Sequence, residues 1–187
     1  FCGVGHLAKA FAREGIESEG WDILDGPDAD FLDPQVVDNF KRRILDHKYL
    51  AIHFGFPCIS WSRARRFDNK GPPPLRDDDD HLMSGFANLS QNDRRKVDEG
   101  NKLLEVMLLL VETAVQLGIS VTIENPASSR VWLVKDLQDL AKRHRSKFCA
   151  VDYCQYGKSW KKPTTFLTFN CGDMNLRRCK GKMGLCS

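Results

Sequence analysis

The sequence predicts an α/β domain with a mostly parallel sheet. Short apolar stretches of strand length alternate along the chain with longer stretches that have an apolar face at helical spacing. The chain has 187 residues, 42% of them hydrophobic, which suits one domain with its own core. No apolar run approaches the roughly 20 residues that a membrane span needs, so we expect no membrane partner.

The first part of the chain predicts two helices and two extended segments. Gly5–Gly15 has apolar residues on one face and a glycine stop, and Pro34–His47 starts with proline and repeats apolar residues at helical spacing. Residues 16–23 read as a short extended piece that ends in an acid. Tyr49–Phe54 is a continuous apolar run, as expected for a strand inside a parallel sheet.

The second part begins with a long loop, residues 55–92, which contains "GPPPLRDDDD" and is either functional or a disordered insert. A long helix with an apolar stripe follows. The remaining pattern predicts a strand, a second helix and two further strands. The long helix is expected over Asp93–Gly118 and the second helix over Val134–His144, and the three strands over Ile119–Asn125, Lys147–Cys154 and Thr164–Asn170.

Polar residues at the carboxyl ends of the strands are candidate ligand contacts, because ligands of open α/β sheets bind at that edge. Gly3 and Gly5 would let a ligand approach the backbone at a helix start. Asp22 could hold a ribose diol beside the flat ring of Trp21, and Asp30 could accept from an exocyclic amine. These positions suggest a nucleoside cofactor, either NAD or S-adenosylmethionine, although an ordinary tight turn and a core tryptophan would look the same.

Cys58 follows one apolar strand, and Glu124 lies at the end of another. Cys58 comes directly after proline at the ligand edge and is a candidate nucleophile, although most lone cysteines are small buried residues. Arg63, Arg65 and Arg66 would favour its thiolate form if they lie close, and they suit phosphates. Glu124 and its neighbour Asn125 end the next strand, where burial of a carboxyl group is costly without a task.

The charge distribution is uneven although the net charge is only +3. Residues 142–187 hold eleven Lys and Arg but only Asp152 and Asp173. A basic end suggests a polyanionic partner, and a solvated surface would give the same composition.

The seven cysteines are odd in number and irregular in spacing, which favours a reducing, intracellular compartment over a disulfide framework. We therefore expect a nuclear protein if the source is eukaryotic and a cytoplasmic one otherwise. Three cysteines in the basic end, Cys171, Cys179 and Cys186, could begin a small zinc module or lie in an unstructured tail. We expect no metal at the strand-end site itself.

Taken together, the chain resembles the cytosine-5 DNA methyltransferases. "FCGVG" is similar to their cofactor loop, "GFPCISWS" to their nucleophile motif, and "IEN" to their Glu-Asn-Val motif with Pro126 in place of valine. "YGKSWKKPTTFLTF" (Tyr156–Phe169) stands where the family has a basic motif. The resemblance implies a Rossmann-like S-adenosylmethionine-dependent methyltransferase sheet. It also implies a partial catalytic domain over residues 1–169 that lacks its first strand, and a Cys-containing basic tail over 170–187 that begins a further module.

The resemblance also implies the residues of the site. Cys58 would attack carbon 6 of a flipped cytosine, Glu124 would hold the ring nitrogen and amino group, and Asn125 would orient the loop that carries Cys58. S-adenosyl-L-methionine would be the cofactor. Its expected contacts are Phe1, Gly3, Gly5, His6, Leu7, Trp21, Asp22, Asp30, Phe31 and Pro57. Expected contacts to DNA are Ser60, Ser62, Arg63, Arg65, Lys161 and Lys162, on a mobile loop and on the basic motif.

The basic motif departs from the family pattern. Trp160, Lys162 and Thr164 stand where the family has glutamine and two arginines, so recognition of the cytosine O2 would fall to Lys161 or Lys162. Two other readings stay open: a nucleic-acid-binding relative that lost catalysis, and an enzyme that methylates cytosine in tRNA.

Overall fold

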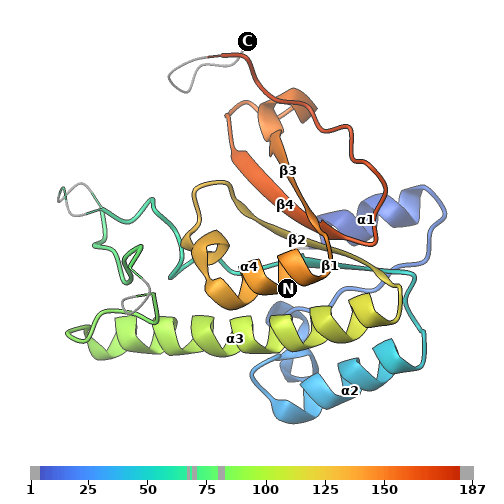
Figure 1. Cartoon of the computed structure of the whole chain (residues 1–187), viewed down its shortest axis with the longest axis horizontal. Coiled ribbons are helices and arrows are strands. Elements are labelled where there is room, and N and C mark those ends of the chain that lie inside the picture. The colour runs from blue at the N-terminus through green and yellow to red at the C-terminus, as the bar shows by residue number, and fades with distance from the viewer. Residues whose placement is uncertain (1–4, 67, 69–70, 80–82, 182–187) are drawn as a thin grey trace.

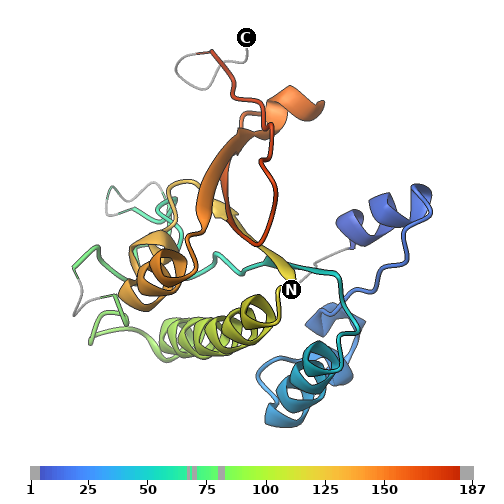
Figure 2. The same cartoon turned by 45° about the vertical axis from the view of Figure 1, so that its right-hand side comes forward.

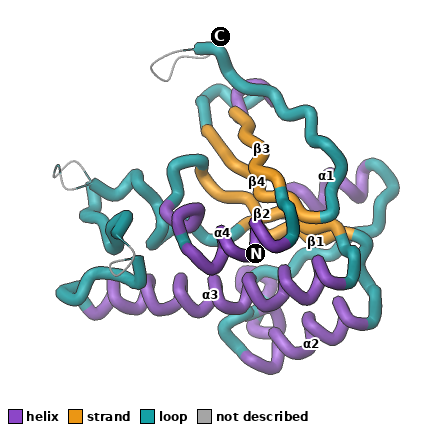
Figure 3. The backbone as a smooth tube through the Cα atoms, in the orientation of Figure 1, coloured by secondary structure: helices purple, strands orange, loops and turns teal. Residues whose placement is uncertain are grey.

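The computed structural model describes residues 5–66, 68, 71–79 and 83–181. Four strands form one open sheet in the order β1-β2-β4-β3, with helices α3 and α4 on one side of it and α2 packed against α3 (Figure 1). Figure 3 shows the long loop that leads from the end of β1 to the start of α3. The expected α/β class is therefore confirmed.

The sheet is mixed, which corrects the expectation of a mostly parallel one. β1 (Ala51–Gly55) pairs in parallel with β2 (Ser120–Pro126), but β4 (Pro163–Phe169) is antiparallel to both β2 and β3 (Lys147–Asp152). Residues 153–162 are too few for the crossover of a dozen or so residues that a parallel connection needs, so β3 and β4 form a hairpin. As a result β1, β2 and β3 run in one direction, and their carboxyl ends share one edge.

The three large helices follow the predicted positions. α2 spans Pro34–Leu45, α3 spans Gln91–Gln116 and α4 spans Lys135–Arg143. Asp33 and Ser90 cap the first two, each accepting a hydrogen bond from a backbone amide of the first turn. These caps fix where the helices begin, and so where the preceding loops must end.

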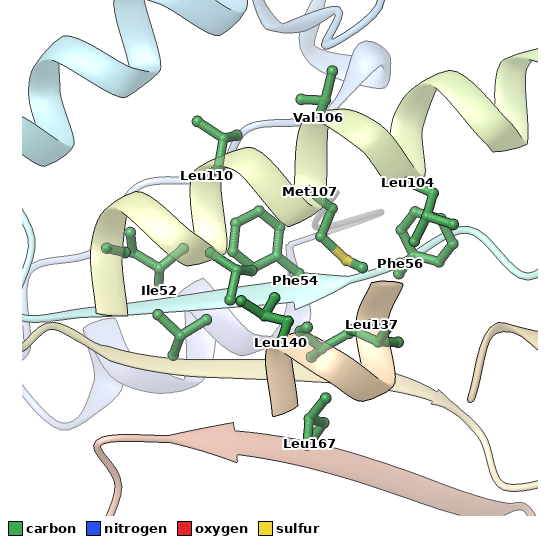
Figure 4. Packing of buried hydrophobic residues seen from close by; sticks show 14 of the residues in the cluster. Ile52, Phe54, Phe56, Leu104, Val106, Met107, Leu110, Leu137, Leu140 and Leu167 are labelled. Carbon is green, nitrogen blue, oxygen red and sulfur yellow. The ribbon is translucent and has the colours of Figure 1, made fainter. Parts of the chain in front are cut away.

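The core lies between α3, α4 and one face of the sheet. Figure 4 shows Phe54 of β1, Met107 of α3 and Leu140 of α4 packed against one another. Alternate residues of β1 and β2 face this core, because successive side chains of a strand point to opposite sides. His53 and Glu124 therefore face the other side of the sheet, whereas Asn125 faces the core and is 1% exposed.

The N-terminal elements contribute little to the core. α1 (His6–Arg13) is confirmed as a helix, but none of its residues is buried, and Leu7 and Phe11 remain exposed. Figure 2 shows α1 set apart from α2 and α3. The extended piece expected over residues 16–23 does not become a strand. Residues 16–22 belong to neither a helix nor a strand, and two short 3-10 turns follow them, η1 (Ile23–Asp25) and η2 (Pro27–Ala29).

The long loop between β1 and α3 is packed rather than loose. Its described residues form neither helix nor strand, as predicted, yet Trp61, Leu75 and Arg76 are almost fully buried. The reading of a disordered insert is therefore wrong for this described part.

The described tail, residues 170–181, runs back along the end of β3. The backbone of Arg177 accepts from the Asp152 amide at 3.1 Å, and the Asp152 carboxylate accepts from the Cys179 amide and from Arg178. Burial alone would raise the pKa of Asp152, but these hydrogen bonds outweigh it and hold the pKa below its usual value. Cys149 on β3 is half-buried, because β3 is the last strand of the sheet.

Candidate functional site

Two hydrogen bonds clamp the segment before Cys58 onto β2. Gly55 lies opposite Glu124 in the parallel ladder, and the Phe56 amide donates to the Glu124 carbonyl at 3.2 Å. The side-chain amide of Asn125 then donates to the Phe56 carbonyl at 2.6 Å. Because Asn125 is buried, this bond is shielded from water and ties the end of β1 directly to the end of β2.

Cys58 lies in a tight turn just past this clamp. The Trp61 amide donates to the Cys58 carbonyl at 3.0 Å, which closes the turn. The Cys58 side chain is half-buried and so remains partly accessible. The thiol and the Glu124 carboxylate thus come from two adjacent strand ends at one edge of the sheet.

The Glu124 carboxylate lies among three proton-carrying side chains. Lys162 Nζ is 3.6 Å from Oε1 and His53 Nε2 is 3.8 Å from Oε2, and Tyr153 lies close enough for the Glu124 charge to raise its pKa. His53 is fixed by its other ring nitrogen, which lies 2.8 Å from the Thr122 hydroxyl. A carboxylate held this way can accept or share a proton with a ligand placed at the same edge.

The protonation of these neighbours follows from their surroundings. Burial lowers the pKa of His53, and the Glu124 charge opposes this only in part, so the ring is neutral at pH 7. Burial raises the pKa of Tyr153, and the nearby Glu124 charge raises it further. Tyr153 therefore keeps its proton and serves as a donor.

The basic motif divides its two lysines between different tasks. Lys162 reaches Glu124 and also lies 5.0 Å from the centre of the Tyr153 ring, whereas Lys161 donates to the Gly181 carbonyl in the tail. Trp160 is 58% exposed, and Thr164 is fully buried with its hydroxyl donating to the Lys162 carbonyl. Of the two lysines, the geometry brings Lys162 to the site.

The arginines expected at phosphates are engaged within the protein. Arg63 pairs with Asp78 at 2.7 Å, and Arg65 lies 3.5 Å from Asp93 in the first turn of α3. Arg65 is also mostly buried. Arg66 lies 4.0 Å from Asp68 and remains largely exposed. In this structure the two arginines that we expected at DNA organise the loop instead.

The two serines of this loop also differ from the expectation of phosphate contacts. Ser60 is 3% exposed and accepts a hydrogen bond from Arg76 at 2.9 Å, so its hydroxyl faces the protein interior. The Ser62 hydroxyl accepts from the Ala64 amide, which stabilises the local turn.

The expected cofactor residues are placed in different surroundings. Phe1 and Gly3 lie outside the described residues. Gly5 precedes α1 with φ +67°, the left-handed conformation that glycine favours, and His6 and Leu7 lie on the exposed α1. Pro57, just before Cys58, is half-buried.

Around η1 and η2, the Asp22 carboxylate accepts from the Leu24 amide and the Asp30 carboxylate from the Leu32 amide. Trp21 is half-buried against Phe40 and Arg43. Phe31 is 4% exposed in the same aromatic cluster and serves as a core residue, which corrects its assignment to a cofactor.

Sequence reasoning missed four residues that build the site. Tyr153 follows β3 at the same edge, and its position after a strand was a usable signal. His53 lies inside an apolar run and gave none. Arg130 is mostly buried and bonds the Asp78 carboxylate at 3.0 Å, while its own amide donates to the Trp61 carbonyl. Arg76 lies in a proline-rich stretch that reads as exposed loop.

In the part of the chain that the structure describes, no group of three or more His, Cys, Asp or Glu side chains is arranged to hold a metal ion. The Cys171 thiol contacts the carbonyls of Phe169 and Val121, and the Cys179 backbone amide donates to the Asp152 carboxylate. Cys186, the third residue of the expected zinc module, lies outside the described residues. The hollow of about 280 Å³ between α3 and α4 is lined by residues of those helices and by none from the strand-end edge.

No family model matches this chain, and no curated protein or solved structure is significantly similar to it. Within the described ranges, none of the helices combines the length and the apolar character required to cross a bilayer. The function must therefore be argued from the site.

Proposed function

We propose that the protein transfers a methyl group from S-adenosylmethionine to carbon 5 of cytosine in DNA. The single observation that carries the proposal is the clamp between the two strand ends. It ties the turn of a half-buried thiol to the strand that presents a carboxylate surrounded by proton donors. A nucleophile beside an acid at one sheet edge suits addition to an electron-poor ring.

The proposed chemistry uses each group once. The Cys58 thiolate adds to carbon 6 of the ring, and Glu124 shares a proton with the ring nitrogen N3, which accommodates the electron pair displaced from the double bond. When bound, S-adenosylmethionine supplies the methyl group for carbon 5. A base then removes the proton of carbon 5, and the bond between sulfur and carbon 6 breaks, which restores the ring and the thiolate.

The neighbours of Glu124 support this assignment. Lys162 places a positive charge beside the carboxylate, where it can also donate to the cytosine O2. Tyr153 keeps its proton beside Glu124, because burial and the Glu124 charge both raise its pKa, so its hydroxyl is available as a donor at the site. The neutral His53 lies on the other oxygen and limits how far that carboxylate can turn.

The cofactor assignment rests on the residues around η1. Trp21 and Asp22 offer an aromatic ring and a carboxylate on adjacent positions, and Asp30 adds a second partly exposed carboxylate. The ring can stack on an adenine, and the carboxylates can accept hydrogen bonds from ribose hydroxyls and from the adenine amine. Phe31 does not take part, because it is buried. We propose that Asp22 and Asp30 hold the cofactor and that Gly5 allows it to approach the start of α1.

A mechanism-based trap tests the proposal. A 5-fluorocytosine in the substrate lacks the proton at carbon 5, so the adduct with Cys58 should persist and survive denaturing electrophoresis in the presence of S-adenosylmethionine. We expect Cys58→Ser to abolish the adduct and Glu124→Gln to slow it strongly. Cys171→Ser, at the opposite end of the sheet, is the matched control and should trap as the wild type does.

A second candidate is a nucleic-acid-binding relative without catalysis, and the observation that favours it is the exposed Trp160 in the basic motif. Binding of DNA with no trapping, on either DNA or tRNA, would support that candidate and overturn the proposal. Trapping on tRNA alone would assign the same chemistry to RNA.

A further inference from the structure

Arg76 is completely buried, which is unusual for an arginine. Its guanidinium group makes four hydrogen bonds to three separate segments. Nη1 donates to the Met83 carbonyl at 2.7 Å and to Asn101 Oδ1 at 2.6 Å. Nη2 donates to the Ser60 hydroxyl at 2.9 Å and to the Val97 carbonyl at 3.0 Å. One side chain therefore ties the loop after Cys58 to helix α3.

The same guanidinium lies flat over Trp61, with 3.6 Å between the guanidinium carbon and the centre of the ring. Gly100 of α3 makes room for this stack. A Cβ atom at this position would lie 2.5 Å from the Ser60 hydroxyl and 3.1 Å from Arg76 Nη2. The loop and the helix can approach this closely only because position 100 has no side chain.

The partners of Arg76 are neutral. Among the described residues it forms no ion pair, and burial lowers the pKa of its guanidinium to about 9, which still leaves it charged at pH 7. A buried charge without a counterion costs stability, and an apolar side chain would fill the same space at lower cost. What the guanidinium adds is a planar set of donors that fixes three segments in one geometry.

This geometry bears directly on the nucleophile. The Trp61 amide closes the turn onto the Cys58 carbonyl, and within this turn Arg76 contacts Ser60 and Trp61. On the other side of Cys58, Phe56 is held by Asn125. The thiol therefore lies between two anchored points, one on β2 and one on α3.

We propose that Arg76, seated against Gly100, is a positioning residue that holds the turn of Cys58 against α3. It acts through Ser60 and Trp61 and does not touch the ring that Cys58 attacks. Its role in catalysis rests on the proposed function, but its effect on the thiol does not.

The test is the alkylation rate of Cys58 in the intact protein. Iodoacetamide is added to the folded protein, and the modified sites are quantified after trypsin digestion. Cys58 is the only cysteine in the peptide Tyr49–Arg63, and Cys149 and Cys154 share the peptide Phe148–Lys158, which serves as the internal reference.

We expect Arg76→Lys and Arg76→Met to raise the Cys58 rate at least roughly tenfold, because loss of even one of the four charge-assisted hydrogen bonds corresponds to about that factor. The turn then opens more often, while the reference thiols keep their rates. Arg95→Met, which changes an exposed arginine of α3, is the matched control and should change neither rate. An unchanged Cys58 rate in a folded Arg76 variant would overturn the proposal. So would an equal rise in all thiols, because that reports general loosening.

Gly100→Ala gives an independent test in case the Arg76 variants do not fold. A glycine replaced by alanine inside a helix normally stabilises it. Here we expect the opposite local effect, a selective rise in Cys58 alkylation, because the added methyl group displaces Ser60 and Arg76. Unchanged alkylation would contradict the close seating.

Failure of the proposed function is separable from failure of this inference. If no variant traps 5-fluorocytosine but the Cys58 rate still rises selectively, Arg76 positions the thiol and the reaction is a different one. If the wild type is active, the same variants should show a lower kcat with an unchanged KM for DNA, since they disturb the nucleophile and not the binding surface.

Discussion

Lys162 and Lys161 are adjacent in the sequence and differ in what they reach. Lys162 lies beside Glu124, whereas Lys161 bonds the backbone of the tail. The sequence offered both as substitutes for a missing arginine and could not choose between them, because the choice depends on which way each side chain leaves the start of β4.

This pair gives a prediction with a built-in control. We expect Lys162→Met to lower the rate of adduct formation about 100-fold, the usual loss when one donor to a developing negative charge is removed. Lys161→Met should stay near the wild-type rate. The measurement is the time course of 5-fluorocytosine trapping, and equal losses in the two variants would remove the special role of Lys162.

His53 makes folding stability depend on pH. Because the pKa of His53 is lower in the folded protein than its ordinary value of 6.5, the unfolded chain takes up the proton more readily. The stabilisation by neutral His53 is therefore complete above pH 6.5 and is lost as the pH falls through 6.5 toward the lower folded value.

We expect His53→Gln, which keeps a partner for Thr122, to flatten this dependence. Urea midpoints measured from about pH 8 down to about pH 5.5 should fall less in the variant than in the wild type. A steeper fall in the variant would show that the sign of the His53 contribution is the reverse.

At the scale of elements, the clamp between β1 and β2 connects stability to the site. Removal of the Asn125 amide leaves the buried Phe56 carbonyl without its donor, so Asn125→Ala should lower the free energy of unfolding by about 1–3 kcal/mol. Asn92→Ala, on the exposed first turn of α3, should change it by less than about 0.5 kcal/mol. Urea denaturation measures both, and a negligible loss at Asn125 would mean that the clamp does not hold the strand ends together.

The sequence was most informative about individual elements. α2, α3, α4 and all four strands lie close to their predicted ranges, because apolar periodicity is a local property of the chain. The prediction of an extended piece before Asp22 did not yield a strand, since an extended segment becomes a strand only when a partner strand is available. The pairing of β4 between β2 and β3 was also missed, because it depends on which strands meet and not on their own pattern.

The site was predictable to the same extent. Cys58, Glu124 and Asn125 could be proposed because each lies at the end of an apolar strand or just after it. Most of the partners that define their setting come from distant segments. Tyr153 could have been found from its position after a strand, whereas no local pattern reveals the contacts of Arg76 and Arg130. The arginines and Ser60 of the loop were assigned to an external ligand because the sequence does not show that Asp78, Asp93 and Arg76 already engage them.

Considered as a whole, the molecule has its core on one side of the sheet and its candidate site at the edge where β1, β2 and β3 end. The tail returns to that edge, where its backbone binds the buried Asp152. At Glu124, residues from both halves of the chain meet, namely His53 and Lys162. α1 alone stands outside this arrangement, with its apolar residues exposed.

The order of the strands also has a consequence for how the chain folds. The β3–β4 hairpin joins residues at most 21 positions apart, from Lys147 with Thr168 down to Asp152 with Pro163, whereas the clamp on β1 joins residues 69 positions apart. Closure of longer loops costs more entropy and is slower, so we expect the hairpin amides to gain protection before the Phe56 amide in pulsed hydrogen exchange. Simultaneous protection would contradict this order. If the hairpin forms first, β1 and β2, which bring Cys58 and Glu124 to one edge, are the last strands to pair. Partly folded chains then expose the Cys58 thiol before its neighbours at the site are in place.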